Sequence, residues 1–195
     1  MYCGGVLDLK ILGFLDEGPL HGYELRRRIN ELDGPGSHLS EGSLYPALAR
    51  LERAGLLTRA EAPGSRGRAR KVVTITDAGR VRLRELLASP GESETASLPA
   101  FLEHLAFLSR LDDPAARRTL LERRLEVLAG KPPAFFYDDG RPRGAADEPD
   151  PYRLGMIRIA GAARRAEIIW LREMLAEPTA QPESPRSAAR LPLEH

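Results

Sequence analysis

The chain has 195 residues and a mass of 21.5 kDa, enough for one large domain or two smaller ones. Hydrophobic residues at 42% and charged residues at 29% are ordinary globular usage, which excludes wholesale disorder, collagen and a disulfide-rich miniprotein. Cys3 has no second cysteine to pair with, no apolar run reaches the roughly 18–20 residues of a membrane span, and the N-terminus lacks the build of a signal peptide. We therefore expect a cytoplasmic protein.

The formal charge is +1, from 29 basic and 28 acidic residues, but it is unevenly distributed. Residues 59–71 contain one acid, Glu61, and five basic residues: Arg59, Arg66, Arg68, Arg70 and Lys71. This is the one basic concentration that a function must explain.

Two helices are expected in the first 33 residues. One runs through residues 7–15, with its apolar side chains at helical spacing, and ends before Pro19. The other begins near His21 and stops at residues 33–36, where glycine and proline break the pattern.

A third helix carries a leucine stripe and ends at Gly55. Proline lacks an N–H and is tolerated only in the first turn of a helix. Pro46 therefore predicts that regular helix begins near Ser43, with Ser40 or Ser43 as the N-cap.

A two-stranded hairpin is predicted next. Residues 56–59 and 71–76 are apolar and β-branched, and they flank a tip that contains glycine, proline, serine and most of the basic residues. Thr76 is a typical N-cap for a following helix. The apolar stripe of that helix comprises Val81, Leu83, Leu86 and Leu87.

Short helices followed by a basic hairpin are typical of a winged helix-turn-helix, which binds DNA because a helix fits the major groove and hairpin arginines reach phosphates or the minor groove. Four motifs in order resemble the N-terminal domain of the PadR-like transcriptional regulators: ILGFL at 11–15, GPLHGYEL at 18–25, GSLYPALARLERAGLL at 42–57 and TITDAGR at 74–80. The resemblance covers about residues 6–87. It implies a homodimeric, mostly repressing DNA-binding protein with a helical C-terminal dimerisation region.

Two sites depart from the family pattern. Val72 and Val73 replace an aromatic pair that is common in the second strand, and Ala69 replaces a proline in the hairpin tip. Valine suits a strand, so the expected fold is unchanged, whereas the tip is expected to be less rigid.

The candidate DNA contacts lie on the third helix and on the hairpin. They are Ser40, Ser43, Tyr45, Arg50, Arg53, Arg66, Arg68, Arg70 and Lys71. The resemblance assigns a phosphate contact to Tyr45, and the arginines suit phosphates or guanine edges. Each has a simpler alternative: the serines only cap the helix, the tyrosine packs, and the arginines are solvated.

No enzyme site is apparent. The four histidines show no metal-ligand spacing, and the pair His21 and Glu24 fits the start of a helix better than a metal site. Nothing around Cys3 marks a nucleophile, and the glycines near residues 64–67 lack the Walker spacing. We expect no catalysis, no metal and no cofactor.

The second half is expected to be helical. Three regions are predicted: a winged helix domain at 1–90, a helical region at 91–176, and a disordered tail with a tag remnant at 177–195. A break at residues 89–97 separates the first two, and the helical region contains an exposed loop at 131–151. The last helix is expected at about 152–176. Dimerisation is assigned to the apolar stripes, because a monomer would expose too much of them: Leu98, Phe101, Leu102, Leu105, Leu154, Ile157, Ile168, Leu171 and Leu175.

The predicted function is a homodimeric bacterial repressor that binds a pseudo-palindromic operator and is relieved by a small molecule. Phe101, Phe107 and Trp170 are candidates for a pocket in which a planar aromatic effector stacks, although ordinary interface packing also explains them. Two other classes remain open. One is a winged helix that binds proteins, and the other a ligand-sequestering protein, both without DNA binding and both disfavoured by the basic hairpin.

Overall fold

A computed structural model describes residues 5–62, 70–130, 137–138, 141–143 and 148–176. The chain divides into two compact units, residues 1–130 and 131–195. The predicted fold class is confirmed: the chain is mainly helical, and a winged helix with a small antiparallel sheet is followed by further helices. The predicted boundary near residue 90 falls inside the first unit.

In its described residues, the first unit contains helices, one short 3-10 turn and three strands. In chain order these are α1 (Gly5–Glu17), β1 (Leu20–His21), α2 (Gly22–Asp33), α3 (Glu41–Arg53), β2 (Leu57–Ala62), β3 (Arg70–Ile75), α4 (Asp77–Ala88), α5 (Glu92–Ala96), α6 (Leu98–Leu105), η1 (Leu108–Arg110) and α7 (Pro114–Ala129).

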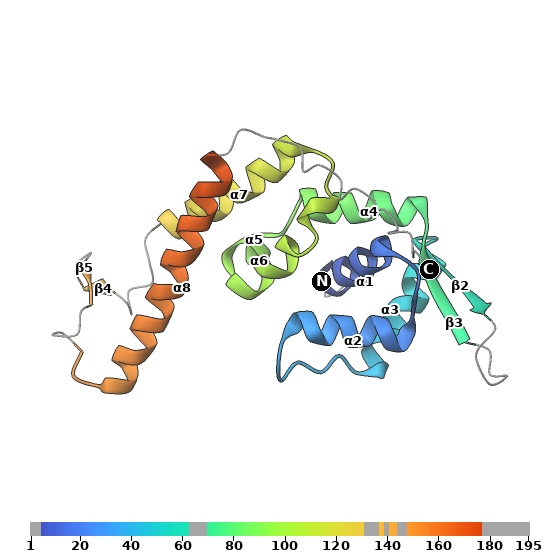
Figure 1. Cartoon of the computed structure of the whole chain (residues 1–195), viewed down its shortest axis with the longest axis horizontal. Helices are drawn as coiled ribbons and strands as arrows, with labels where there is room; N and C mark the ends of the chain where they lie inside the picture. The colour runs from blue at the N-terminus through green and yellow to red at the C-terminus, as the bar shows by residue number, and fades with distance from the viewer. Residues whose placement is uncertain (1–4, 63–69, 131–136, 139–140, 144–147, 177–195) are drawn as a thin grey trace, which may run out of the picture. The chain divides into compact units, whose positions relative to one another are not determined.

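Helix α1 forms the centre of this unit (Figure 1). It contacts α2, α3, α4, α6 and β3, and a helix that is covered on all sides must be apolar around most of its circumference. Leu9, Ile11, Leu12 and Leu15 are accordingly buried. Full burial of one such side chain stabilises the fold by about 2 kcal/mol.

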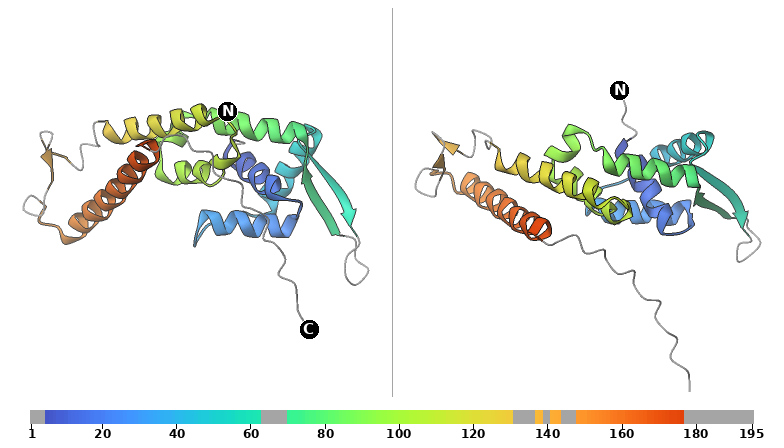
Figure 2. Two further views of the ribbon diagram at one scale, coloured as in Figure 1. Left: turned by 45° about the horizontal axis from the view of Figure 1, so that its top comes forward. Right: turned by 90° about the horizontal axis from the view of Figure 1, so that it is seen from above.

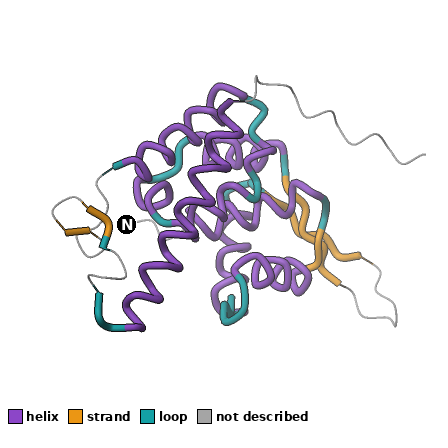
Figure 3. Tube along the Cα trace, turned by 60° about the vertical axis from the view of Figure 1, so that its left-hand side comes forward, coloured by secondary structure: helices purple, strands orange, loops and turns teal. Residues whose placement is uncertain are grey.

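The sheet has the strand order β1-β3-β2, and all its pairings are antiparallel. Strands β2 and β3 pair over their whole length, from Leu57 opposite Ile75 to Ala62 opposite Arg70, and extend side by side away from the helices (Figures 2 and 3). The predicted wing is confirmed. Sequence reasoning missed β1, because two residues, paired as Leu20 with Val73 and His21 with Val72, are too few to show a strand period.

Helix α3 starts two residues earlier than expected. Ser40 is its N-cap: the side-chain oxygen of Ser40 accepts a hydrogen bond from the Ser43 N–H at 3.2 Å. Pro46 therefore lies inside the helix, beyond the first turn, where the expectation did not put it. At the other end, Gly55 has φ +71° and begins a Schellman motif in which the Leu56 N–H bonds the Leu51 carbonyl.

Helix α4, which follows the wing, begins after Thr76 as predicted. Thr76 is its N-cap: Thr76 Oγ1 accepts a hydrogen bond from the Gly79 N–H at 3.0 Å. Its predicted apolar stripe is wrong at Val81, whose side chain is 53% exposed. The predicted break at residues 89–97 contains α5 instead of an open linker.

The second unit is described only in part. Strand β4 (Tyr137–Asp138) pairs antiparallel with β5 (Arg141–Pro142), within the stretch expected to be an open loop, and α8 spans Pro151–Ala176, as the last helix was predicted to do. Residues 177–195 lie outside the described residues. Among the helices that the structure describes, none combines the length and apolar character needed to span a bilayer.

Candidate nucleic-acid interface

Helix α3 presents its outer face to solvent. Leu44, Leu48 and Leu51 point into the core and are almost fully buried. The opposite face carries exposed or half-exposed residues at helical spacing: Gly42, Pro46, Ala49 and Arg53. Gly42, Pro46 and Ala49 are small, so this face of the helix can approach another surface closely.

The two predicted arginines of α3 differ in their environment. Arg50 donates two hydrogen bonds to the Asp8 carboxylate, Nη1 to Oδ2 at 2.8 Å and Nη2 to Oδ1 at 2.5 Å. Arg53 is exposed and donates a hydrogen bond to the Ala49 carbonyl of its own helix at 3.3 Å. The guanidinium of Arg50 is therefore paired with α1, whereas that of Arg53 lies on the outer face of α3.

A groove of about 640 Å³ lies beside α3. Its walls come from the start of α2, from α3 and from the sheet: His21, Gly22, Tyr23, Tyr45, Leu48, Arg59, Lys71 and Val73. The Tyr45 ring lies over Gly22, where an added Cβ would be 3.4 Å from the Tyr45 Cε1 atom. Tyr45 is 45% exposed and lines the groove.

One wall of the groove carries an ion pair. Arg59 of β2 donates to the Glu52 carboxylate of α3 from both Nε, at 2.8 Å, and Nη2. These hydrogen bonds lower the pKa of Glu52, with a further Coulomb contribution from Lys71, and they raise the pKa of Arg59. Lys71 is exposed beside this pair and forms no ion pair with any residue that the structure describes.

The other wall is the start of α2. The His21 N–H donates to Glu24 Oε2 at 3.0 Å, which lowers the pKa of the Glu24 carboxyl, and the Tyr23 hydroxyl donates to Glu24 Oε1 at 3.3 Å. The His21 ring stacks on Tyr23, with centroids 5.7 Å apart, and its Nδ1 lies 3.3 Å from the Lys71 carbonyl oxygen.

Sequence reasoning missed a second hollow, beside α2, whose arginines are paired with acids: Arg26 with Glu41 and Arg27 with Glu31. A hollow of about 580 Å³ is lined by Tyr23, Arg26, Arg27, Asn30, Glu31, Gly34 and Pro35. Arg26 pairs with Glu41 at the start of α3 at 2.8 Å. The available signal was the run of three arginines at 26–28, of which Arg27 lies opposite the buried Leu25 and Ile29 and is exposed.

The structure describes only part of the predicted hairpin. Arg66 and Arg68 lie outside the described residues, and for Arg70 of β3 only the backbone pairing with Ala62 of β2 is described. Their assignment to DNA stays a prediction. Lys71 is the one of the four predicted wing cations whose side chain the structure describes.

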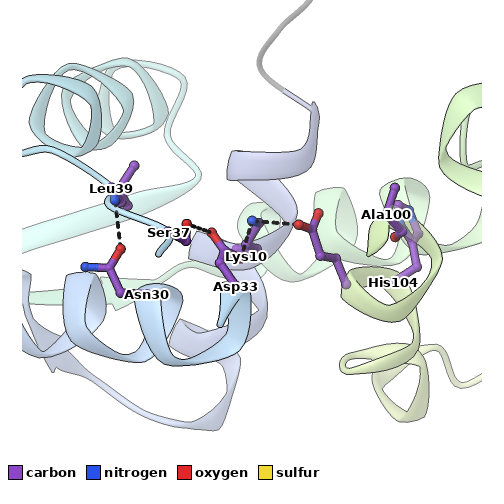
Figure 4. Close-up of polar contacts among 8 residues, drawn as sticks. Lys10, Asn30, Asp33, Ser37, Leu39, Ala100 and His104 are labelled. Atoms are coloured by element: carbon purple, nitrogen blue, oxygen red, sulfur yellow. Dashed lines mark hydrogen bonds and ion pairs between the residues drawn. The ribbon is translucent and has the colours of Figure 1, made fainter. Parts of the chain in front are cut away.

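The turn that leads into α3 is fixed by polar contacts (Figure 4). Lys10 of α1 is buried and donates to Asp33 Oδ1 at 2.5 Å and to Glu103 Oε1 of α6 at 3.0 Å. The Ser37 hydroxyl donates to Asp33, and the Leu39 N–H donates to Asn30 Oδ1 at 2.7 Å. These bonds hold the segment between α2 and Ser40 against both α1 and α6.

The residues assigned to dimerisation in the first unit divide into two groups. Leu102 is 50% exposed, and Leu98 and Leu105 are half-buried. Phe101 is 1% exposed and lies under the Arg124 guanidinium, so its ring belongs to the core of its own unit and is closed to a partner.

The other assigned residues lie on α8, where Leu171 is buried and the rest are half-buried: Leu154, Ile157, Ile168 and Leu175. Of the expected effector pocket, Phe107 packs edge-on against Phe14 at 5.0 Å and is buried, and Trp170 lies half-buried on α8. The rings of Phe101 and Phe107 are thus used in packing. In the described part of the chain no three histidine, cysteine or acidic side chains group closely enough for a metal ion.

Taken together, the three-stranded sheet, α2 and α3 with their fixed turn, and the wing define a winged helix-turn-helix protein. The family model of the transcriptional regulator PadR-like family matches residues 11–85. The chain is 43% identical over 77 residues, 40% of its length and 68% of the relative's, to the transcriptional regulator Rv3488 of Mycobacterium tuberculosis. This chain belongs to the PadR-like family of transcriptional regulators.

Two further similarities extend beyond the winged helix. An uncharacterized 37.1 kDa protein in transposon TN4556 of Streptomyces fradiae is 34% identical over 134 residues, which are 68% of this chain and 37% of that protein. The chain thus spans little more than a third of the length of that relative. Bacillus subtilis PadR in complex with operator DNA is 23% identical, with 88% of this chain and 97% of that chain covered and a TM-score of 0.43.

Proposed function

We propose that this protein regulates transcription by binding duplex DNA as a homodimer, with the outer face of α3 in the major groove and the wing on the phosphate backbone. The observation that carries the proposal is the surface around α3. Two of its acids are engaged, Glu52 by Arg59 and Glu41 by Arg26. Lys71, which lies opposite Glu61 in the strand pairing, and Arg53 form no ion pair among the described residues.

The shape of α3 supports the same function. The small side chains of Gly42, Pro46 and Ala49 allow the helix axis to approach the floor of a major groove, and apolar side chains suit thymine methyl groups. Ser40 and Ser43, joined by a 3.0 Å hydrogen bond between their hydroxyls, stand at the N-terminus of the helix, where a phosphate oxygen is favoured.

Dimerisation is supported by α8. Large apolar side chains at helical spacing are exposed on one face of this helix, Tyr152 at 87%, Met156 at 42% and Ile159 at 74%. A second copy is the partner that a two-fold operator requires. Light scattering should give a dimer, and Ile159→Lys should shift it towards the monomer, whereas the control Arg158→Lys on the same helix should not.

The direct test is binding to the DNA upstream of the protein's own gene. Wild-type protein should retard this fragment, and Tyr45→Phe, which removes only the hydroxyl, should weaken binding by about tenfold if that hydroxyl donates to a phosphate. Failure of the wild-type protein to bind any duplex at low salt would overturn the proposal and leave a protein-binding winged helix.

Relief of repression by a small molecule is the further part of the proposal. Because Trp170 is the only tryptophan, its fluorescence reports on α8 specifically. A planar aromatic acid that releases the DNA should change this fluorescence over the same concentration range. Release of DNA without any change at Trp170 would place the effector elsewhere.

A further inference from the structure

The groove beside α3 contains an ionisable group that the proposed DNA contacts do not use. His21 is the last residue of β1, next to Lys71 on β3, and it lines the same groove as Tyr45, whose ring lies over the neighbouring Gly22. Sequence reasoning gave it only a role in starting α2. Its backbone N–H does serve that role through Glu24, but its ring points to Lys71 and lines the groove.

The hydrogen bond of the ring restricts its protonation state. A backbone carbonyl only accepts hydrogen bonds, so the contact between His21 Nδ1 and the Lys71 oxygen requires a hydrogen on Nδ1. In the neutral ring Nε2 is then bare and can only accept. A phosphate oxygen also only accepts, so Nε2 can bind it only when the ring is the imidazolium.

The charged groups around the ring are of both signs. The Glu24 carboxylate lies on the same turn, with a lowered pKa, and favours a cation beside it. On the sheet, Lys71 and Arg59 disfavour the cation, whereas the Glu52 carboxylate offsets Arg59 and Glu61 of β2 lies opposite Lys71 in the strand pairing. A phosphate entering the groove would add negative charge next to His21, Lys71 and the Tyr45 hydroxyl.

We infer that His21, as its imidazolium, binds a phosphate of the DNA backbone in the groove together with Lys71 and Tyr45, so that DNA binding takes up a proton. The inference rests on the proposed function, of which it specifies one contact and its regulation. The contact is to the backbone and carries no sequence preference, so any duplex reports on it.

The test measures fluorescence anisotropy of a labelled 30-base-pair duplex of mixed sequence at low salt, at pH 6 and pH 8. Wild-type affinity should fall by about five- to tenfold from pH 6 to pH 8 if the contact requires the imidazolium. His21→Gln should bind about as weakly at both pH values, and His21→Arg, a permanent cation, should bind tightly at both.

His38→Gln is the matched control, because His38 is exposed and does not line the groove. It should keep the wild-type pH dependence. The inference is overturned if wild-type affinity is the same at pH 6 and pH 8, or if His21→Gln keeps the full pH dependence while its thermal unfolding matches that of the wild type. Absence of any duplex binding by the wild type at pH 6 would instead overturn the proposed function as well.

Discussion

Arg50 of α3 and Asp8 of α1 are joined by two parallel hydrogen bonds, although 42 residues separate them in the chain. A bidentate pair of this kind fixes the relative orientation of the two side chains as well as their distance. The arginine that the sequence placed among the DNA contacts thus holds α3 on the central helix. Its neighbour Arg53, one turn further on, has no such role.

Replacement of Arg50 should therefore reduce stability. Arg50→Ala leaves the Asp8 carboxylate, which is only 12% exposed, without its partner, so the free energy of unfolding should fall by about 1–2 kcal/mol. Arg53→Ala should change it by less than about 0.5 kcal/mol and weaken DNA binding instead. Urea unfolding and duplex binding of both variants check this; equal loss of stability in the two would contradict it.

Neutralising Glu52 should strengthen DNA binding. Glu52→Gln removes a negative charge beside Lys71 and frees Arg59, so low-salt affinity for a duplex should rise about threefold. Glu122→Gln on α7, which also removes an acid, should leave the affinity unchanged. A decrease in affinity with Glu52→Gln would indicate that the carboxylate positions Arg59 for the phosphate.

The same carboxyl gives a pH dependence of stability. Arg59 lowers the pKa of Glu52 below its ordinary value of 4.5, so the ion pair stabilises the folded state above pH 4.5 and its contribution disappears as the pH falls through the folded-state value. Acid unfolding of Glu52→Gln should lack this component. Identical acid-unfolding curves for the variant and the wild type would contradict it.

Lys10 should be among the most sensitive polar residues. Lys10→Met leaves the carboxylates of Asp33 and Glu103 facing each other without a cation, which should cost about 3 kcal/mol of unfolding free energy. The exposed pair of Arg118 and Glu122 on α7 is the control, and Glu122→Gln should cost less than about 0.5 kcal/mol. A Lys10→Met variant as stable as the wild type would show that the cluster is not needed to hold the turn before α3.

Gly79 marks a close contact between α4 and the start of the wing. A Cβ there would lie 2.0 Å from the Leu56 carbonyl oxygen, so Gly79→Ala should lower the thermal midpoint strongly. Gly42→Ala is the matched control, since the nearest atom to its added Cβ is 3.7 Å away and alanine favours helix. The control should be as stable as the wild type or more so; equal destabilisation in both would contradict the packing at Gly79.

Local signals predicted the elements of the winged helix well. Capping by Ser40 and Thr76, the glycine after α3 and the β-branched strands all depend on neighbours in the chain, so they are visible in the sequence. The start of α3 was misplaced because the Ser40 cap outweighs the preference of Pro46 for the first turn.

Long-range partners could not be predicted in the same way. The hydrogen bonds of Arg50 to Asp8 and of Lys10 to Glu103 join residues 42 and 93 positions apart, which no periodicity encodes. For the same reason Phe107 was assigned to a ligand pocket, although its ring packs on Phe14 and against Gly13. That Tyr23 and His21 line one groove could be seen only in the folded chain.

The salt dependence of duplex binding tests the central claim most directly. If the surface of α3 and the wing binds phosphates, log K should fall steeply and linearly with log salt, and Lys71→Gln should reduce the slope by about one unit. Arg82→Gln, an exposed cation on α4 paired with Glu85, should leave the slope unchanged. Binding that is insensitive to salt, or a slope that Lys71→Gln and Arg82→Gln alter equally, would contradict the account.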